Sequence, residues 1–226
     1  RGVRKRGETV HVGSTEQHGP HLPLATDTIQ IVEIARQTVA RLAKEGITVV
    51  AGPTIPFGVA PYHMPFAGTI SLRSSTLDAL IKDVCHSLYH HGFRKFFLLL
   101  GHGGNLPVMQ VVTQDLVTEL PESSVYFLNW LPASEASYSE ILVSKKAEGH
   151  SGEGETARVM VTHPNLVQMD RARVYYSQEA EDLESEDHPL MGGGVMEGIR
   201  NWREVTSIGS SGNPTLATPE TGQKSY

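Results

Sequence analysis

The chain has 226 residues and a formal net charge of −6, from 19 basic and 25 acidic residues, which argues against a nucleic-acid-binding surface. No apolar run reaches the roughly 20 residues that cross a membrane, and no signal peptide is visible. The single cysteine, Cys85, excludes an internal disulfide and fits a reducing compartment. We therefore expect a cytoplasmic protein with no nucleic-acid or membrane partner, in which residues 1–226 form a single domain.

Strands are predicted where short apolar or β-branched runs stand between turn residues. The run at 96–100 is apolar throughout, as expected for a strand that is buried on both faces of a parallel sheet. The four prolines within 53–67 predict irregular structure there. The predicted strands cover residues 9–12, 47–51, 69–72, 96–100 and 125–128.

Helices are predicted where apolar residues recur at three- and four-residue spacing. Ser74 or Ser75 is the expected N-cap of the second helix. The acidic stretch 179–187 indicates a solvated loop, and the three glycines at 192–194 indicate a flexible or tightly packed segment. Alternating strands and helices predict an α/β fold with a mostly parallel sheet. The predicted helices cover residues 31–42, 77–88, 106–120, 134–147 and 155–162, with another beginning at 218.

Three polar segments, 13–27, 102–105 and 150–156, fall in or near strand-to-helix loops. Ligands of open α/β sheets collect in such loops, at the carboxyl ends of the strands. Glutamate, aspartate and histidine form the ligand set of zinc, manganese or iron(II). Glu16 and His18 point the same way if the chain between them is extended, because they are two residues apart.

Each of these residues also has a structural interpretation. Asp27 stands at a helix start, where it could bridge two ions or serve only as the N-cap. Glu155 could be a solvated residue in a first helical turn, where the helix dipole favours it. His63 could brace the proline-rich loop, and His21 is better explained as loop-bracing than as a ligand. The glycine-rich stretch 101–104 lacks the sequence endings of phosphate-binding loops.

Five segments of the chain resemble the creatininase (creatinine amidohydrolase) family, in order and over nearly its whole length. The first, VGSTEQHGPHLPLATD at 12–27, is the most specific because of its Glu-Gln-His-Gly-Pro-His core. The others are FAGTISL at 66–72, preceded by His63, GHGGN at 101–105, HSGEGET at 150–156 and GNPTLAT at 212–218.

The resemblance implies a three-layer fold, with a mostly parallel central sheet flanked by helices, and a site for two divalent metal ions. The ions are expected to be zinc, with manganese or iron as alternatives. Asp27 is expected to bridge them, Glu16 and His102 to bind one ion, and His18 to bind the other.

The third segment departs from creatininase proper, which carries a tyrosine and a metal-site glutamate where this chain has Gly103 and Gly104. The remaining carboxylate ligand must therefore come from elsewhere. Glu155 is our candidate, with Glu153 as the alternative. The two glycines also open the pocket beside the metals, and this makes creatinine a doubtful substrate.

The resemblance also suggests catalytic and substrate-binding residues. His150 corresponds to the proton-shuttling histidine of the family, and Glu155 is expected to assist catalysis as well as bind metal. Ser71 matches a position near the substrate in creatininase. We add His63, Gly103 and Asn105 to the expected substrate-binding residues.

The function implied is that of a metal-dependent amidohydrolase that cleaves a non-peptide C–N bond of a small molecule, a cyclic amide or formamide. Its nucleophile would be a hydroxide activated by both metals. A hydrolase of a cyclic ketone or of a modified precursor peptide is the alternative within the family. A non-catalytic metal-binding module would have lost a ligand, and none of the four metal ligands named above is lost. Family members form homo-oligomers, hexamers among them, so we expect a homo-oligomer.

Overall fold

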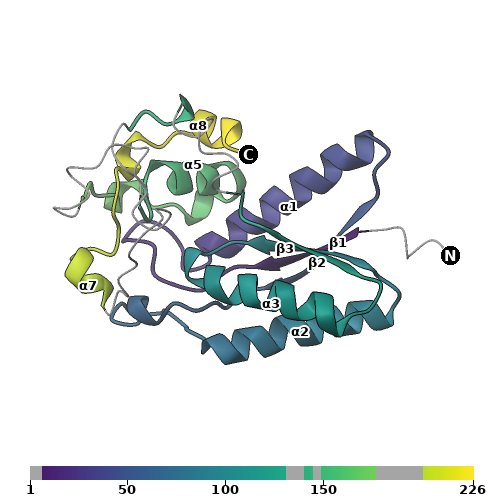
Figure 1. Cartoon of the computed structure of the whole chain (residues 1–226). Coiled ribbons are helices and arrows are strands. Elements are labelled where there is room, and N and C mark those ends of the chain that lie inside the picture. Colours follow the sequence, from purple (N-terminus) through teal and green to yellow (C-terminus); the bar gives the residue numbers. More distant parts are fainter. Residues whose placement is uncertain (1–6, 131–139, 145–148, 177–200) are drawn as a thin grey trace.

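The computed structural model describes residues 7–130, 140–144, 149–176 and 201–226. A parallel sheet of four strands, in the order β2-β1-β3-β4, forms the centre of the molecule (Figure 1). Helices cover both of its faces, so the predicted three-layer α/β fold is confirmed. The strands are β1 (Gly7–Val12), β2 (Val49–Ile55), β3 (Lys95–Leu100) and β4 (Ser124–Leu128).

The two faces of the sheet follow from side-chain alternation along β3. Phe96, Leu98 and Leu100 point into the main core, which they share with α2 (Ser74–His90) and α3 (Leu106–Glu119). Phe97 and Leu99 point to the other face, against α1 (Thr26–Lys44). Two covered faces explain why this strand is apolar throughout.

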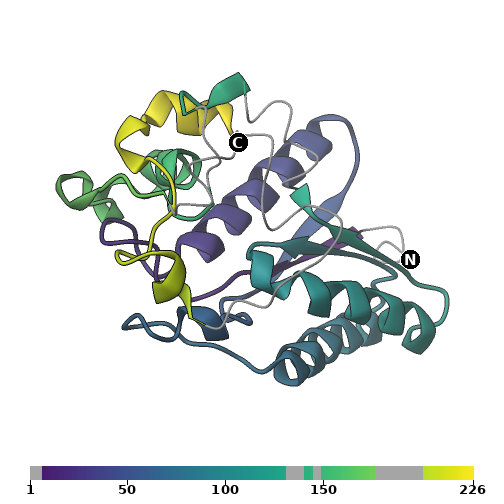
Figure 2. The ribbon, with the colours of Figure 1, turned by 60° about the vertical axis from the view of Figure 1, so that its left-hand side comes forward.

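The C-terminal part of the chain lies at the carboxyl end of the sheet, beyond the ends of β1 and β3 (Figures 1 and 2). There, α5 (Glu153–Thr162) packs against α1 and against α8 (Pro219–Lys224), while α7 (Trp202–Val205) lies beside the loop that follows β2. None of the described helices is long and apolar enough to cross a membrane.

Two strand predictions are wrong in detail. Strand β2 continues through Gly52 and Pro53 to Ile55, past the residues expected to end it. Proline is tolerated because β2 is an edge strand, and the register with β1 shifts at this point. Residues 69–72 form no strand, only isolated bridges that pair Ile70 with Thr15 and the neighbouring Ser71 with Gly58.

One capping prediction is wrong, and the alternative role of Asp27 as an N-cap is excluded. Arg73, rather than Ser74 or Ser75, is the N-cap of α2, and no side chain caps it. Ala25 is the N-cap of α1, so Asp27 lies inside the first turn and does not cap the helix. Its carboxylate is therefore directed elsewhere.

The helix predicted at 134–147 lies mostly, and the segments 179–187 and 192–194 wholly, outside the described residues.

Truncating Leu98 tests the position of the core. Leu98 is completely buried on a central strand, so Leu98→Ala is expected to lower the free energy of unfolding by about 2–5 kcal/mol. Val111 is 59% exposed on α3, and Val111→Ala is expected to change it by about 0.5 kcal/mol or less. Urea unfolding of both variants makes the comparison, and equal losses would contradict this placement of the core.

Candidate metal centre

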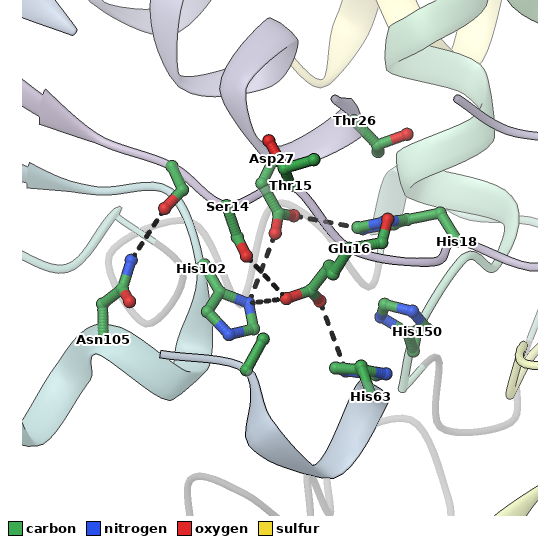
Figure 3. Close-up of polar contacts among 12 residues, drawn as sticks. Ser14, Thr15, Glu16, His18, Thr26, Asp27, His63, His102, Asn105 and His150 are labelled. Atoms are coloured by element: carbon green, nitrogen blue, oxygen red, sulfur yellow. Dashed lines mark hydrogen bonds and ion pairs between the residues drawn. The ribbon is translucent and has the colours of Figure 1, made fainter. Parts of the chain in front are cut away.

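Buried polar side chains meet at the carboxyl ends of β1 and β3 (Figure 3). The loop after β1 contributes two of them, the first turn of α1 one and the loop after β3 another. The loop after β2, the segment before α5 and the first turn of α5 complete the cluster with one residue each. The cluster consists of Glu16, His18, Asp27, His63, His102, His150 and Glu155, of which all but the last two are less than 9% exposed.

Asp27 occupies the centre of the cluster, with its two carboxylate oxygens facing different histidines. Its Oδ1 lies 3.1 Å from His18 Nε2, and its Oδ2 lies 3.3 Å from His102 Nδ1. Within the described part of the chain, Oδ2 accepts no hydrogen bond although it is fully buried. A buried carboxylate oxygen without a donor calls for a cation.

The first group of ligand atoms surrounds His102. Its Nε2 lies 3.2 Å from the carbonyl oxygen of Val59, and a carbonyl only accepts, so Nε2 carries the hydrogen. Its Nδ1 then presents a lone pair to Glu16 Oε2 at 3.2 Å and to Asp27 Oδ2 at 3.3 Å. The Ser14 hydroxyl also donates to Glu16 Oε2, at 2.8 Å. Three acceptors directed at one point repel one another unless a cation lies among them.

The second group of ligand atoms repeats this arrangement around His18. Its Nδ1 donates to the carbonyl oxygen of Glu16 at 3.1 Å, so its Nε2 presents the lone pair. That nitrogen faces Asp27 Oδ1 at 3.1 Å and Glu155 Oε2 at 3.9 Å. Asp27 therefore belongs to both groups. Donor atoms of Glu16, His18 and Asp27 lie within 4.8 Å of one another, and so do those of His18, His150 and Glu155.

The charges of the cluster also require positive charge among the ligand atoms. Burial lowers the pKa of His18, but Asp27, Glu155 and Glu16 outweigh it and raise this pKa to about 10. The pKa of His102 is likewise raised, against the effect of burial, chiefly by Glu16. Without ions, protons on the two inner nitrogens supply the positive charge that the carboxylates require. A divalent cation can replace these protons, so the residues present fit a metal site.

Contacts with Gln17 determine which ring nitrogen carries the hydrogen in two further histidines, His63 and His150. Its side-chain oxygen accepts from the Gly19 amide at 3.0 Å, so its Nε2 donates to His63 Nδ1 at 2.8 Å. His63 Nε2 therefore carries the hydrogen and faces Glu16 Oε1 at 3.3 Å, as a donor rather than a metal ligand. His150 Nε2 donates to the Gln17 carbonyl at 2.8 Å, and its Nδ1 retains a lone pair.

The choice between Glu155 and Glu153 follows from what each carboxylate contacts. Glu153 is completely buried and accepts from the backbone amides of Val143 at 2.9 Å and Ser144 at 2.7 Å. Glu155 directs Oε2 toward His18. The geometry therefore favours Glu155 as the carboxylate of the second group, and it is not a solvated residue of the first turn.

Two residues expected at the substrate, Ser71 and Asn105, form hydrogen bonds with the backbone, and their contact with a substrate stays a prediction. The Ser71 hydroxyl accepts from the Ala60 amide at 3.0 Å and donates to the Leu72 carbonyl at 3.2 Å. Asn105 is completely buried, accepts from the Val59 amide at 2.9 Å and donates to the Gly13 carbonyl at 3.0 Å. Both side chains hold the loops around the cluster in place.

The two glycines of the third segment differ in their surroundings. A β-carbon on Gly103 would meet nothing within 4 Å. A β-carbon on Gly104 would collide with the Val59 carbonyl, and it would lie 2.5 Å from His102 Nε2 and 2.8 Å from the Tyr62 hydroxyl. Position 104 therefore has no room for a metal-binding glutamate, which again leaves Glu155 for that role.

Several residues around the cluster went unnoticed in the sequence. Gln17 and Ser14 stand inside the most specific segment, but spacing alone does not show which histidine or carboxylate they contact. Tyr62 packs on the ring of His63, with the ring centroids 4.6 Å apart, and an aromatic residue next to a histidine in sequence gives no signal of this contact. Trp202, for which the sequence left a core position and a wall of the substrate pocket both open, also packs on His63, with the centroids 5.0 Å apart. His21 contacts Thr156 at 2.9 Å and braces the start of α5, as expected.

Known proteins of similar sequence include hydrolases. A 29%-identical relative is the mycofactocin precursor peptide peptidase of Mycolicibacterium smegmatis, with an alignment of 218 residues that covers 96% of this chain and 78% of the relative. The 3-dehydro-scyllo-inosose hydrolase of Thermotoga maritima is 28% identical over 172 residues, which cover 72% of this chain and 52% of that protein.

Solved structures share the fold. A Bacteroides fragilis homologue of creatinine amidohydrolase superposes with a TM-score of 0.78 at 27% identity, over 98% of this chain and 83% of the other. A manganese creatininase superposes with a TM-score of 0.75 at 18% identity, over 98% and 85%. The sequence model of the family described as creatininase, creatinine amidohydrolase, matches residues 5–226. The chain therefore belongs to the creatininase family, whose relatives named here are hydrolases.

Proposed function

We propose that the protein is an amidohydrolase that depends on two divalent metal ions and cleaves a C–N bond of a small amide. One observation carries the proposal: two buried imidazoles each present an inner nitrogen to a pair of carboxylate oxygens, and Asp27 belongs to both pairs. Glu16, His102 and Asp27 would hold one ion. His18, Glu155 and Asp27 would hold the other.

Zinc or manganese in these positions would supply a Lewis acid and lower the pKa of water, so that a nucleophile is available near neutral pH. The chain itself fixes where the ligands point. The outer nitrogens of His18 and His102 each donate to a backbone carbonyl, which holds both rings in one tautomer.

His150 is the proton carrier in this proposal. Its ring packs between those of His18 and His63, with centroids 4.3 and 4.7 Å away, and Nε2 is anchored on the Gln17 carbonyl. Burial, followed by the neighbouring His18, lowers the pKa of His150, so the ring is neutral and Nδ1 is free to take a proton. The proton that His150 takes up would come from the attacking water, and His150 would pass it to the departing nitrogen as the C–N bond breaks.

A second candidate is hydrolysis of a peptide bond in a modified peptide. It is favoured by the 29% identity to a mycofactocin precursor peptide peptidase over 96% of the chain. A peptide bond is itself an amide, so the same ligands and the same proton carrier would serve. The exposed space beside Gly103 would admit a substrate larger than a compact ring.

A homo-oligomeric state and a cytoplasmic location stay predictions.

Replacing Asp27 with asparagine tests the centre of the proposal. The variant keeps the shape of the side chain but removes one negative charge, so binding of at least one ion is expected to weaken. Turnover is expected to fall at least about a hundredfold, the effect of losing a positioned catalytic group. Elemental analysis and turnover are measured on one preparation, with circular dichroism to confirm folding. A folded variant with two ions and full activity would make Asp27 structural.

Replacing His150 with alanine separates proton transfer from metal binding. The variant is expected to keep both ions and to lose turnover by about 10²–10⁴-fold, the usual contribution of a general acid–base. Metal content is measured beside the rate, and Trp202→Phe, which keeps a ring against His150, is the control for packing. Loss of an ion from His150→Ala would instead identify His150 as a ligand.

Substrate preference is tested with a panel of creatinine, other cyclic amides, formamides, short peptides and a cyclic ketone. Because no carboxylate fits at position 104, creatinine is expected to be turned over with a kcat/KM below about 10⁴ M⁻¹s⁻¹, the low end of ordinary enzymes. Released amine or ammonia identifies C–N cleavage. Activity on the ketone alone, without release of amine, would contradict the proposed reaction class.

A further inference from the structure

The largest of the fully buried side chains among the described residues is that of an arginine. Arg158, on α5, is 2% exposed, and its guanidinium lies 5.1 Å from the centre of the Trp130 ring. Its Nε donates to the side-chain oxygen of Gln30 on α1. A buried guanidinium is costly unless hydrogen bonds satisfy it, so a specific arrangement around Arg158 is enforced.

That bond determines which way the Gln30 amide points. Gln30 is 3% exposed and lies one turn after Asp27, on the same face of α1. Because its oxygen accepts from Arg158, its nitrogen points to the opposite side and donates to Glu155 Oε1 at 3.3 Å. A flipped amide would present an oxygen to the Glu155 carboxylate and a nitrogen to the guanidinium, and both contacts would be repulsive.

Gln30 and one backbone amide together orient the Glu155 carboxylate. Oε1 accepts from Gln30, and Oε2 accepts from the Ser151 amide at 2.6 Å while it faces His18. Ser151 adopts a left-handed backbone conformation, with a φ of 56°. This conformation is uncommon outside glycine, and non-glycine residues that adopt it cluster at functional sites. Two donors therefore fix the carboxylate in one rotational position.

The other group of ligand atoms is held differently. Glu16 is oriented by Ser14, two residues away in the same loop, and His102 by the Val59 carbonyl. Among the described contacts of Glu16 and His102, none comes from α5 or from Gln30. Apart from Asp27, which both groups share, the first ligand group is therefore held by loops, whereas Glu155 of the second group is held by a connection between α1 and α5.

We propose that Arg158 and Gln30 are positioning residues that set the affinity of the second ion alone, the ion at His18 and Glu155. The inference rests on the proposed two-metal function and deepens it. Arg158 fixes the Gln30 amide, Gln30 fixes Glu155, and Glu155 completes the second ligand group. The ion at Glu16 and His102 is independent of this chain of contacts, so the two positions can be emptied separately.

The test is a Zn²⁺ titration of ion-free protein by calorimetry with a competing chelator, followed by elemental analysis after desalting. Wild type is expected to bind two ions. Gln30→Met keeps the length of the side chain but removes its donor, so the Kd of one of the two ions is expected to rise about 10–100-fold, the usual cost of losing such a partner of a ligand. The Kd of the other ion is expected to stay the same, and Glu155→Gln, which changes a ligand of the second group directly, is expected to weaken the same single ion as Gln30→Met.

Gln37→Met is the matched control, because Gln37 lies on the same helix and donates to Glu33 at 2.9 Å, far from the cluster. Both affinities are expected to equal those of wild type. Gln30→Asn, which stays polar but is too short to reach Glu155, replaces Gln30→Met if that variant fails to fold. Equal weakening of both ions, or no weakening of either, would overturn the proposal, and so would a wild type that binds fewer than two ions.

The titration also separates this proposal from the proposed function. It measures ion binding without any substrate, so an inactive wild type that binds two ions with the expected asymmetry would refute the amidohydrolase function and leave the positioning roles intact. Conversely, an active enzyme in which Gln30→Met binds both ions normally would refute only the positioning roles.

Discussion

The carboxylates of Glu16 and Asp27 lie almost completely buried beside each other, and this burial of negative charge constrains everything around them. Removing one such ion from water costs several kcal/mol even after a protein has relaxed. The positions of Asp27 and Glu155 in the first turns of α1 and α5 recover only about 0.3–1 kcal/mol each from the helix dipoles. Positive charge must therefore enter the cluster, as protons on the histidines or as metal ions.

The parallel sheet brings these charges together without long connections. Strands β1 and β3 are neighbours, so the loops that follow them end side by side, and the first turn of α1 returns to the same edge. Gly13 makes this return possible, because a β-carbon there would lie 2.9 Å from the Thr28 Cα in the first turn of α1. The layers of the fold thus serve to hold a few donor atoms within hydrogen-bonding distance.

Local pattern was sufficient to predict most of the elements. The apolar run at 96–100 and the helical spacing at 31–42 and 106–120 agree with β3, α1 and α3, since periodicity reports burial directly. The continuation of β2 through Pro53 could not be predicted, because only the finished sheet shows that this strand lies at its edge. The predicted cap at Ser74 or Ser75 was wrong, since Arg73 is the N-cap of α2 and no side chain caps it, whereas Asp27 faces His18 and His102 and does not cap α1.

The ligand cluster was predicted in composition but not in its supporting contacts. Resemblance named Glu16, His18 and Asp27, and the structure adds the geometry that joins them. Gln30 could have attracted notice as a polar residue on the buried face of α1, next to Ile31. Its bond to Glu155 spans 125 positions of sequence, and no spacing rule reaches that far. Hydrogen bonds between side chains of different helices depend on how the helices pack, and they cannot be predicted from the spacing of residues in one sequence.

The crowded surroundings of Gly104 limit how this family can exchange one ligand set for another. A carboxylate supplied from position 104 would require the Tyr62 hydroxyl and the Val59 carbonyl to withdraw first. Withdrawing them removes the hydrogen bond that holds His102, so the intermediate protein would lose the orientation of an existing ligand before it gained the new one. A carboxylate at position 104 and the present orientation of His102 are therefore compatible only if the loop after β2 and the loop after β3 change together.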